Sequence, residues 1–441
     1  MPFDPTRVTH FLRGLPAARR YWVALSGGLD STVLLTALAA ERGGLPGELR
    51  AVHVNHGLNL KADAWQRHCE TQCASLGIPL ELRRVVVRAS TGESLEAVAR
   101  ERRYTAFREL LASDDLLLLA QHEDDQLETF LLQALRGAGV RGLAAMAESA
   151  SFSGLNLARP LLGYSRADLE TWARQQGLSW VEDPSNEDTG FDRNYLRHEV
   201  VPRLKQRWPA AAETVSRSAR LCAEADGLLK ELAAEDASRF RVGETLPLKA
   251  LQELTAPRAR NLLRHWVQDR GLPLPPAQKL DEILRQAEAR ADRNPCIGWE
   301  GAEVRRYRQR LYALRPVPEP PAGFTLKPGV AHDLGPGLGV LKLVPAAGEG
   351  LRANLCGPQG LSIAFRQGGE SCRPAGRAHE RPLKKWLQEL HVVPWLRDRL
   401  PLVQGERGLL AVAGLFVCEP HAARPAEPGL RIEWLEHPPL R

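Results

Sequence analysis

Cysteine is sparse in this sequence, and no two cysteines form a C-x-x-C pair. Seven are scattered over 441 residues, and only Cys69 and Cys73 lie one helical turn apart. Neither a second pair nor a nearby histidine cluster completes a zinc site around them. We therefore expect no metal–thiolate centre, and we expect a reduced, cytoplasmic protein in which this pair packs in the core.

Long apolar runs are also missing. No stretch of about 18 apolar residues occurs, and residues 1–10 lack the apolar segment of a signal peptide. The sequence therefore predicts a soluble protein without membrane contact. Charge of one sign is not in large excess, because 59 Lys and Arg stand against 53 Asp and Glu, a net charge of +6. This excess favours a nucleic-acid partner only weakly, since a solvated surface gives the same balance.

Length and composition predict three domains, because 441 residues exceed what one core supports. Residues 1–211 alternate apolar runs with amphipathic stretches, which is typical of a Rossmann-like α/β domain with a parallel sheet. Residues 212–315 predict a mainly helical middle domain, the Pro-rich residues 316–339 a linker, and residues 340–441 a small mixed α+β domain. In the first domain we expect strands at 21–25, 49–54, 79–87 and 116–120, and a helix at 94–111.

The strongest chemical signal follows the first expected strand. The segment consists of Ser26, Gly27, Gly28, Leu29, Asp30 and Ser31. Its glycines permit a tight turn, and its hydroxyls and the first N–H groups of the next helix can donate to an anion, so it predicts a phosphate-binding loop. It is no Walker A loop, because the position near the phosphates is the acidic Asp30, which predicts Mg²⁺ beside a polyphosphate. The alternative is an ordinary turn with Ser31 as helix N-cap.

A second signal is the acidic cluster after the fourth expected strand. Asp125 and Glu128 are three residues apart, so they share one helix face and can together hold a metal ion or orient an amine. The alternative is that acids in a first helical turn only complement the helix dipole. That alternative explains one carboxylate better than the four found at 123–128.

The S-G-G-L-D-S segment resembles the PP-loop of the ATP pyrophosphatase superfamily, whose members split ATP into AMP and pyrophosphate. With residues 53–58, 120–129, 159–162, 180–186 and 193–198, the chain is similar to the tRNA(Ile)-lysidine synthetase family over most of its length. Many members carry histidine where this sequence has Gln121, so no role is carried over to that position. The helix before the fourth strand matches the family at Glu96, Arg100, Arg103 and Tyr104.

The resemblance implies an ATP-dependent ligase that modifies tRNA(Ile) with a CAU anticodon. ATP would adenylate C2 of the first anticodon cytidine, and the side-chain amine of free L-lysine would then displace AMP to give lysidine. Asp125 or Glu128 would accept the proton of the amine or bind Mg²⁺, and Arg193 or Arg197 would neutralise phosphate charge. The implied site residues are Asp30, Asp125, Glu128 and Arg193 for catalysis, Asp30 and Asp125 for Mg²⁺, and the PP-loop with His53, Asn55 and His56 for ATP.

Basic residues recur beside tryptophan near the C-terminal end, in a block that matches the same family. The composition is typical of a surface that neutralises phosphates and packs a ring against sugar or base. The alternative is a solvated charged face with core tryptophans. The expected tRNA contacts are Arg373, Arg377, Arg381, Lys384, Lys385, Arg397 and Arg399.

Other functions stay open. A PP-loop tRNA thiolase would need suitably placed thiols, and a glutamine-dependent enzyme would need a glutaminase segment, which the sequence does not suggest. A non-catalytic tRNA-binding protein would tolerate a degenerate PP-loop, whereas this one is intact. The oligomeric state is also open, with a homodimer as one option.

Overall fold

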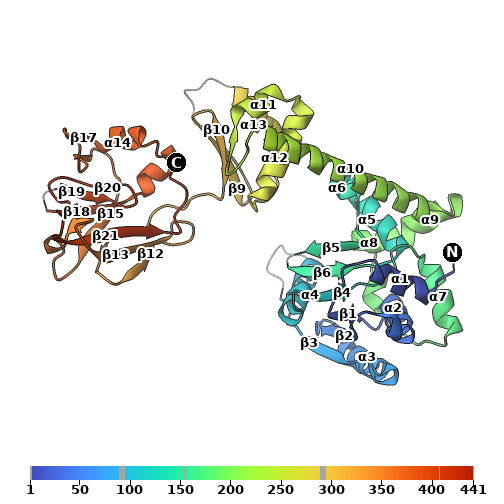
Figure 1. Cartoon of the computed structure of the whole chain (residues 1–441). Coiled ribbons are helices and arrows are strands. Elements are labelled where there is room, and N and C mark those ends of the chain that lie inside the picture. Colours follow the sequence, from blue (N-terminus) through green and yellow to red (C-terminus); the bar gives the residue numbers. More distant parts are fainter. Residues whose placement is uncertain (1, 89–94, 153, 289–294, 407, 441) are drawn as a thin grey trace. The chain divides into compact units, whose positions relative to one another are not determined.

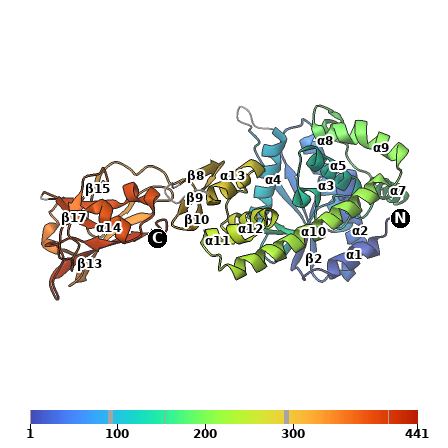
Figure 2. The same cartoon turned by 90° about the horizontal axis from the view of Figure 1, so that it is seen from above.

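The computed structural model describes residues 2–88, 95–152, 154–288, 295–406 and 408–440 (Figure 1). The chain divides into two compact units, Met1–Leu229 and Lys230–Arg441. The long helix α10 (Ala211–Arg239) begins in the first unit and ends in the second (Figure 2). No helix in these described ranges is long and apolar enough to cross a membrane.

The first unit is built on a six-stranded sheet in the order β3-β2-β1-β4-β6-β5. All neighbouring strands pair in parallel except β5 and β6, which are antiparallel at one edge. The Rossmann-like prediction is thereby confirmed, although β5 and β6 were not expected, because each is only four residues long. The strands are β1 (Arg20–Ala24), β2 (Glu48–Asn55), β3 (Leu80–Arg84), β4 (Asp115–Leu118), β5 (Ser149–Phe152) and β6 (Leu155–Ala158).

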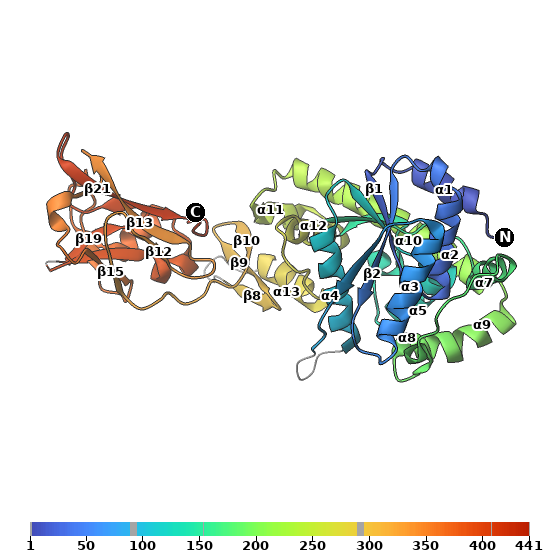
Figure 3. The ribbon, with the colours of Figure 1, turned by 90° about the horizontal axis from the view of Figure 1, so that it is seen from below.

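Helices cover both faces of this sheet (Figure 3). Side chains alternate along β1, so Tyr21 and Val23 pack with α1, α2, α3 and α7, while Trp22 packs with Tyr104 and Phe107 of α4. The expected helix at 94–111 is α4; residue 94 and the side chain of Glu96 lie outside the described residues. The helices are α1 (Pro5–Arg13), α2 (Leu29–Ala40), α3 (Ala62–Leu76), α4 (Leu95–Leu110), α5 (Glu123–Leu135), α6 (Val140–Leu143), α7 (Arg166–Gln175), α8 (Asp192–Tyr195) and α9 (Val201–Arg207).

The second unit begins with helices and a small antiparallel sheet in the order β7-β10-β9-β8. Helices α11 to α13 pack on this sheet around Trp266, Leu262 and Leu280. The helical prediction for the middle region is confirmed, while the sheet beside the helices was largely missed. The elements are β7 (Thr245–Pro247), α11 (Leu248–Glu253), α12 (Ala256–Asp269), α13 (Ala277–Glu288), β8 (Cys296–Trp299), β9 (Ala302–Tyr307) and β10 (Arg310–Leu314).

The rest of the second unit is the predicted mixed α+β part. It contains a five-stranded sheet, β11-β15-β18-β19-β20, and a four-stranded sheet, β12-β13-β21-β14, with a short hairpin β16-β17 and helix α14. Residues 316–323 form no helix or strand, but β11 and β12 lie inside the segment expected as a linker and pair with β15 and β13. The elements are β11 (Phe324–Leu326), β12 (Ala331–Asp333), β13 (Val340–Ala347), β14 (Leu351–Arg352), β15 (Leu361–Phe365), β16 (Ser371–Cys372), β17 (Arg381–Pro382), α14 (Leu383–Glu389), β18 (Pro401–Gly405), β19 (Gly408–Val412), β20 (Phe416–Val417) and β21 (Pro428–Leu435).

Candidate active site

The PP-loop connects the end of β1 to the start of α2. Gly27 has a φ of +85°, and a Cβ at this position would lie 3.0 Å from Val181 Cγ2 and 3.1 Å from Cys69 Sγ. The backbone N–H of Val181 also donates to the carbonyl of Gly27 at 2.9 Å. Only glycine fits this turn, because any side chain would meet both the strained φ and the packed neighbours.

The two serines of the loop hold its shape. Ser26 Oγ lies 3.0 Å from Ser31 Oγ and accepts from the N–H of Gly28 at 3.2 Å. The N-cap of α2 is Gly28 rather than Ser31, and no side chain of the described residues caps it. The first N–H groups of α2 are therefore open to an anion, as in other helix N-termini that bind phosphate.

Asp30 lies in the first turn of α2 and is the acidic residue that distinguishes this loop from a Walker A loop. Its Oδ1 is buried and has no hydrogen-bond partner among the described residues, while Oδ2 lies 3.7 Å from His122 Nε2. Burial raises the pKa of Asp30; the nearby His122 offsets part of this effect and Asp125 adds to it. A buried carboxylate oxygen without a partner is destabilised in water-free surroundings and fits a cation.

The residues present can hold Mg²⁺ only together with a nucleotide. No group of three His, Cys, Asp or Glu within the described ranges is arranged to bind a metal. Mg²⁺ in nucleotide sites usually takes one or two carboxylates and completes its shell with phosphate oxygens and water. Of the two expected ligands, Asp125 already accepts from Arg193, Arg197 and the N–H of His122, whereas Asp30 Oδ1 has no hydrogen-bond partner among the described residues.

Asp125 and Glu128 lie one turn apart in α5 and meet two arginines. Arg193 donates to Glu128 Oε2 at 2.8 Å and to Asp125 Oδ1 at 2.9 Å. Arg197 donates to both oxygens of Glu128, at 2.7 and 2.8 Å, and to Asp125 Oδ1 at 3.1 Å. Burial opposes the charged form of Arg197, but its bonds to Glu128 outweigh this effect and raise its pKa. These four side chains, the charge network below, balance two negative charges with two positive ones.

His122 connects the charge network to the PP-loop, a role that sequence reasoning missed. It is the N-cap of α5, where its Nδ1 accepts from the N–H of Asp125 at 3.3 Å, and its own N–H donates to Asp125 Oδ2 at 3.1 Å. In the neutral ring the proton is therefore on Nε2, which faces Asp30 at 3.7 Å and Asp125 at 3.5 Å. The signal available in the sequence was its place before an acidic helix start.

The residues expected to bind ATP outside the PP-loop, His53, Asn55 and His56, differ in their surroundings. His53 Nδ1 lies 2.8 Å from the carbonyl of Leu25 and so joins β2 to the end of β1. Asn55 donates to Asp63 and Gln66 at 3.1 Å each and accepts from the N–H of Gly57 at 2.9 Å. Both ends of its side-chain amide are therefore engaged within the protein. His56 Nδ1 is buried without a partner in the described part of the chain, and burial, with Arg103 and His53 nearby, lowers the pKa of His56 to about 4. A neutral His56 can accept or donate one hydrogen bond to a base.

Gln121 positions an arginine at the carboxyl end of β6. Arg159 donates to Gln121 Oε1 at 2.9 Å and to the carbonyl of Ala147 at 2.6 Å. Burial lowers the pKa of Arg159, and the positive charge of Arg100 adds to this effect. The motif at 159–162 marked this arginine in the sequence, but its partner was not foreseen.

The cysteines behind the PP-loop are not activated thiols. Cys69 and Cys73 are buried in α3, and burial raises the pKa of Cys69 to about 12 and that of Cys73 to about 11. Both therefore remain protonated near neutral pH, which disfavours the sulfur chemistry of a thiolase.

The C-terminal basic block separates into exposed and engaged cations. Trp386 and Trp395 are only 3% and 7% exposed, so the expectation that a ring stacks on a base is not met. Trp386 Nε1 donates to the carbonyl of Cys372, which fixes this indole in the core. Arg397 donates to the carbonyl of Val392, and Arg399 to those of Pro318 and Trp395. The exposed cations of this block are Arg373, Arg377, Arg381, Lys384 and Lys385.

A strand-to-helix loop with an open helix N-terminus and a buried acid defines the PP-loop class of ATP-using domains. Residues 4–204 match the PP-loop domain family, residues 246–312 the TilS substrate binding domain, and residues 361–434 the TilS substrate C-terminal domain. Among solved structures, a U34-tRNA thiolase from Methanococcus maripaludis is 17% identical and covers 50% of this chain and 78% of that one at a TM-score of 0.41. That likeness is too remote to carry an argument.

Curated relatives match over nearly the whole chain. The tRNA(Ile)-lysidine synthase of Alkalilimnicola ehrlichii is 43% identical over 442 residues, covering 99% of this chain and 98% of the relative. That of Coxiella burnetii is 40% identical, covering 98% and 96%, and that of Serratia proteamaculans is 43% identical, covering 96% and 97%. The chain belongs to the tRNA(Ile)-lysidine synthase family.

Replacing Asp30 by asparagine should remove turnover without harming the fold. Because the folded-state pKa of Asp30 is raised, its ionised form costs stability at neutral pH, and Asn removes that cost. We expect a melting temperature at pH 7 equal to or above that of the wild type. The difference should vanish as the pH falls toward the usual Asp value of about 3.9. The stabilisation by Mg²⁺ and ATP should be lost, and a variant that keeps it would contradict the metal role.

Glu128→Gln should slow single turnover far more than it weakens ATP binding. A neutral side chain leaves two arginines facing one carboxylate, so a stability loss of about 1 to 3 kcal/mol is also expected. The matched control is Glu213→Gln, an exposed acid in the first turn of α10, for which the helix-dipole effect is about 0.3 to 1 kcal/mol.

A charge-balanced double variant, Glu128→Gln with Arg193→Gln, separates stability from catalysis. It should recover part of the lost stability but none of the rate, as measured by thermal melting and quenched-flow turnover. Recovery of the rate would show that the charge network is only structural.

Proposed function

We propose that this chain catalyses formation of lysidine on tRNA(Ile) with a CAU anticodon, using ATP and free L-lysine and releasing AMP and pyrophosphate. Full-length likeness to curated tRNA(Ile)-lysidine synthases carries the proposal, because all three matched regions occur in order on one chain. Asp30, whose Oδ1 is buried without a partner among the described residues, lies beside an open helix N-terminus and supports it independently.

In the first step the PP-loop holds the polyphosphate of ATP against the first N–H groups of α2. Mg²⁺, held by Asp30 with Asp125 as the second expected ligand, would neutralise phosphate charge and orient the leaving pyrophosphate. The O2 atom of the flipped-out cytidine attacks the α-phosphate, so an O–P bond forms and pyrophosphate leaves. The free-energy cost of exposing this base is small, because it lies in a single-stranded loop.

In the second step the amine of lysine replaces the adenylated oxygen at C2. The ammonium group must first lose a proton, and Asp125 and Glu128 are the carboxylates placed to accept it. Arg193 and Arg197 are each about one-third exposed, so they can turn part of their hydrogen bonding toward the phosphate of the departing AMP. When the arginines turn toward the phosphate, oxygens of Asp125 and Glu128 become free to bind the amine, at the stage when negative charge develops on the departing AMP.

Binding of tRNA is assigned to the exposed cations of the C-terminal block. Arg377 and Arg381 lie over the buried Trp386 ring at 5.4 and 5.1 Å and both face Glu389, which holds them in fixed positions. We retain residues 340–441 as a tRNA-binding domain, 212–315 as a tRNA-contacting helical domain, and 1–211 as the catalytic domain.

The function is tested by the dependence of pyrophosphate release on its substrates. Purified protein should release pyrophosphate from ATP only with the tRNA(Ile) transcript, and labelled lysine should enter that transcript and not one carrying a different first anticodon base. A protein that binds tRNA but never releases pyrophosphate would be a non-catalytic binder, and this result would overturn the proposal.

The tRNA surface is tested by salt dependence. The double variant Lys384→Gln with Lys385→Gln should weaken tRNA binding and reduce the slope of log K against log salt by about 0.7 to 0.9 per lost contact. Arg399→Gln is the matched control, since its guanidinium is engaged by backbone carbonyls, and it should lower the melting temperature but leave the slope unchanged. An unchanged slope in the lysine variant would show a merely solvated face.

A further inference from the structure

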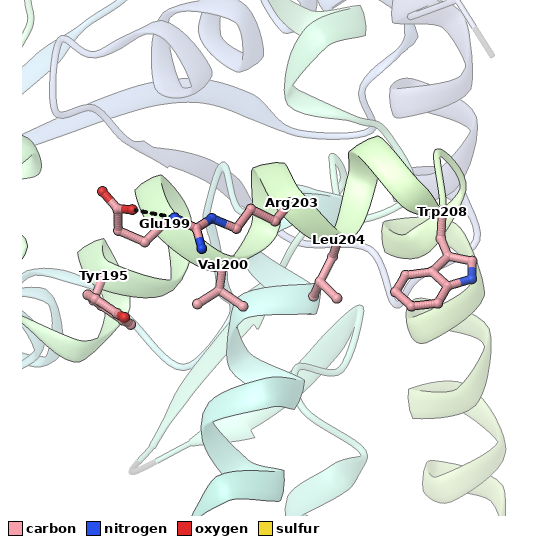
Figure 4. Close-up of a pocket in the computed structure, with 6 residues that line it drawn as sticks. All are labelled: Tyr195, Glu199, Val200, Arg203, Leu204 and Trp208. Carbon is pink, nitrogen blue, oxygen red and sulfur yellow. Dashed lines mark ion pairs between the residues drawn. The ribbon is translucent and has the colours of Figure 1, made fainter.

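A cavity of about 300 Å³ lies along the helical segment that follows the catalytic arginines, and the mechanism above does not use it. It belongs wholly to the first unit. Figure 4 shows four apolar side chains projecting in one row from α8, η3 (Leu196–Val200) and α9. Its lining residues are Tyr195, Glu199, Val200, Arg203, Leu204 and Trp208.

A π-helical turn creates this row. Tyr195 and Val200 are five residues apart, so in an α-helix they would point in clearly different directions. The segment η3 is π-helical, with i to i+5 periodicity, and this extra residue brings Tyr195 onto the face that Leu204 and Trp208 continue at spacings of four. Such turns are frequent at functional sites. A helical rise of about 1.5 Å per residue places Tyr195 and Trp208 about 20 Å apart, so they mark the two ends of a groove.

Both aromatic rings at these ends are exposed. Tyr195 is 52% and Trp208 is 58% exposed, and Phe191 just before α8 is 41% exposed, whereas Trp22 and Phe107 in the core of this unit are buried. Large exposed rings on a charged helix are the usual platform on which unpaired bases stack. Arg207 lies over the Trp208 ring at 5.8 Å, and a guanidinium plane can itself stack on a base.

The charge of the segment fits RNA rather than another apolar surface. Residues 193–208 carry five Arg and Lys against one acid, Glu199. Three of these cations pair with acids of α5, which leaves two, Arg203 and Arg207, on the side of the row. Arg203 pairs with Glu199 at 3.7 Å in an exposed contact that contributes little, so Arg203 and Arg207 remain accessible to phosphates. An apolar partner surface would have to bury these two cations without a compensating charge.

We propose that the row from Tyr195 to Trp208 is a stacking site for unpaired bases of the anticodon loop. The inference rests on the proposed function and extends it with a binding site. Tyr195 lies between Arg193 and Arg197 in the chain, and both arginines contact the reactive carboxylates. Two residues are about 200° of helical rotation, so Tyr195 leaves the side of this turn opposite to the arginines. A loop that delivers one base to Asp125 and Glu128 would cross this turn to place another base on the row.

The test measures binding of an anticodon-loop RNA hairpin, which needs no turnover and so is independent of the proposed reaction. Trp208→Ala should weaken binding about 5- to 150-fold, the effect of losing one stacked base. The loss should be equal at every salt concentration, because stacking releases no counterions. Trp208→Phe should retain most of the affinity. Arg203→Gln should instead reduce the salt slope by about 0.7.

Three controls keep the test decisive. Leu221→Ala removes an exposed apolar side chain of α10 outside the row and should leave hairpin binding unchanged. A fully paired RNA duplex of equal length should bind Trp208→Ala and wild type alike. Tyr195→Ala should repeat the loss, with Tyr195→Phe as its ring-keeping partner. Unchanged hairpin affinity in both Ala variants would overturn the proposal, and unchanged affinity with an altered oligomeric state would assign the row to a homodimer contact instead.

Discussion

The contact between α5 and the α8–η3 segment is the interaction on which the site depends. Asp125 and Glu128 start the helix that follows β4, and the arginines that bind them are 65 to 72 residues further along the chain. Four charges in a partly buried space are stable only as a balanced set, since removal of one partner leaves an uncompensated charge. The network therefore fixes the segment that carries the arginines against α5, close to the carboxyl ends of the strands where the PP-loop lies.

Asp30 differs from Asp125 and Glu128 because no arginine donates a hydrogen bond to it among the described residues. Its Oδ1 is buried without a partner in the described chain, and its pKa is raised by burial. His122 stands between the two environments, with one ring nitrogen fixed by α5 and the other facing Asp30 and Asp125. The PP-loop side of the site thus prefers a cation while the α5 side is already neutralised.

Local features of the fold and site could be predicted from the sequence, and features that depend on distant partners could not. The PP-loop, the helix face shared by Asp125 and Glu128, and the strands β1 to β4 follow from short-range patterns. The short strands β5 and β6 and the sheet of the middle region were not marked by such patterns and form through pairing. The burial of Trp386 and the engagement of Arg399 by backbone carbonyls are also tertiary effects. The alignment of Tyr195 with Val200 requires a π-turn, which contradicts the 3.6-residue period used to read helices.

The central claim is that the chain activates a tRNA base, with the amino acid entering second. The most direct measurement is transfer of label from ATP carrying a radioactive α-phosphate. With tRNA(Ile) and no lysine, labelled AMP should become attached to the tRNA, and addition of lysine should release it as free AMP while lysine joins the tRNA. Labelled AMP formed from ATP and lysine without tRNA, or a tRNA that never acquires label under single-turnover conditions, would contradict the account.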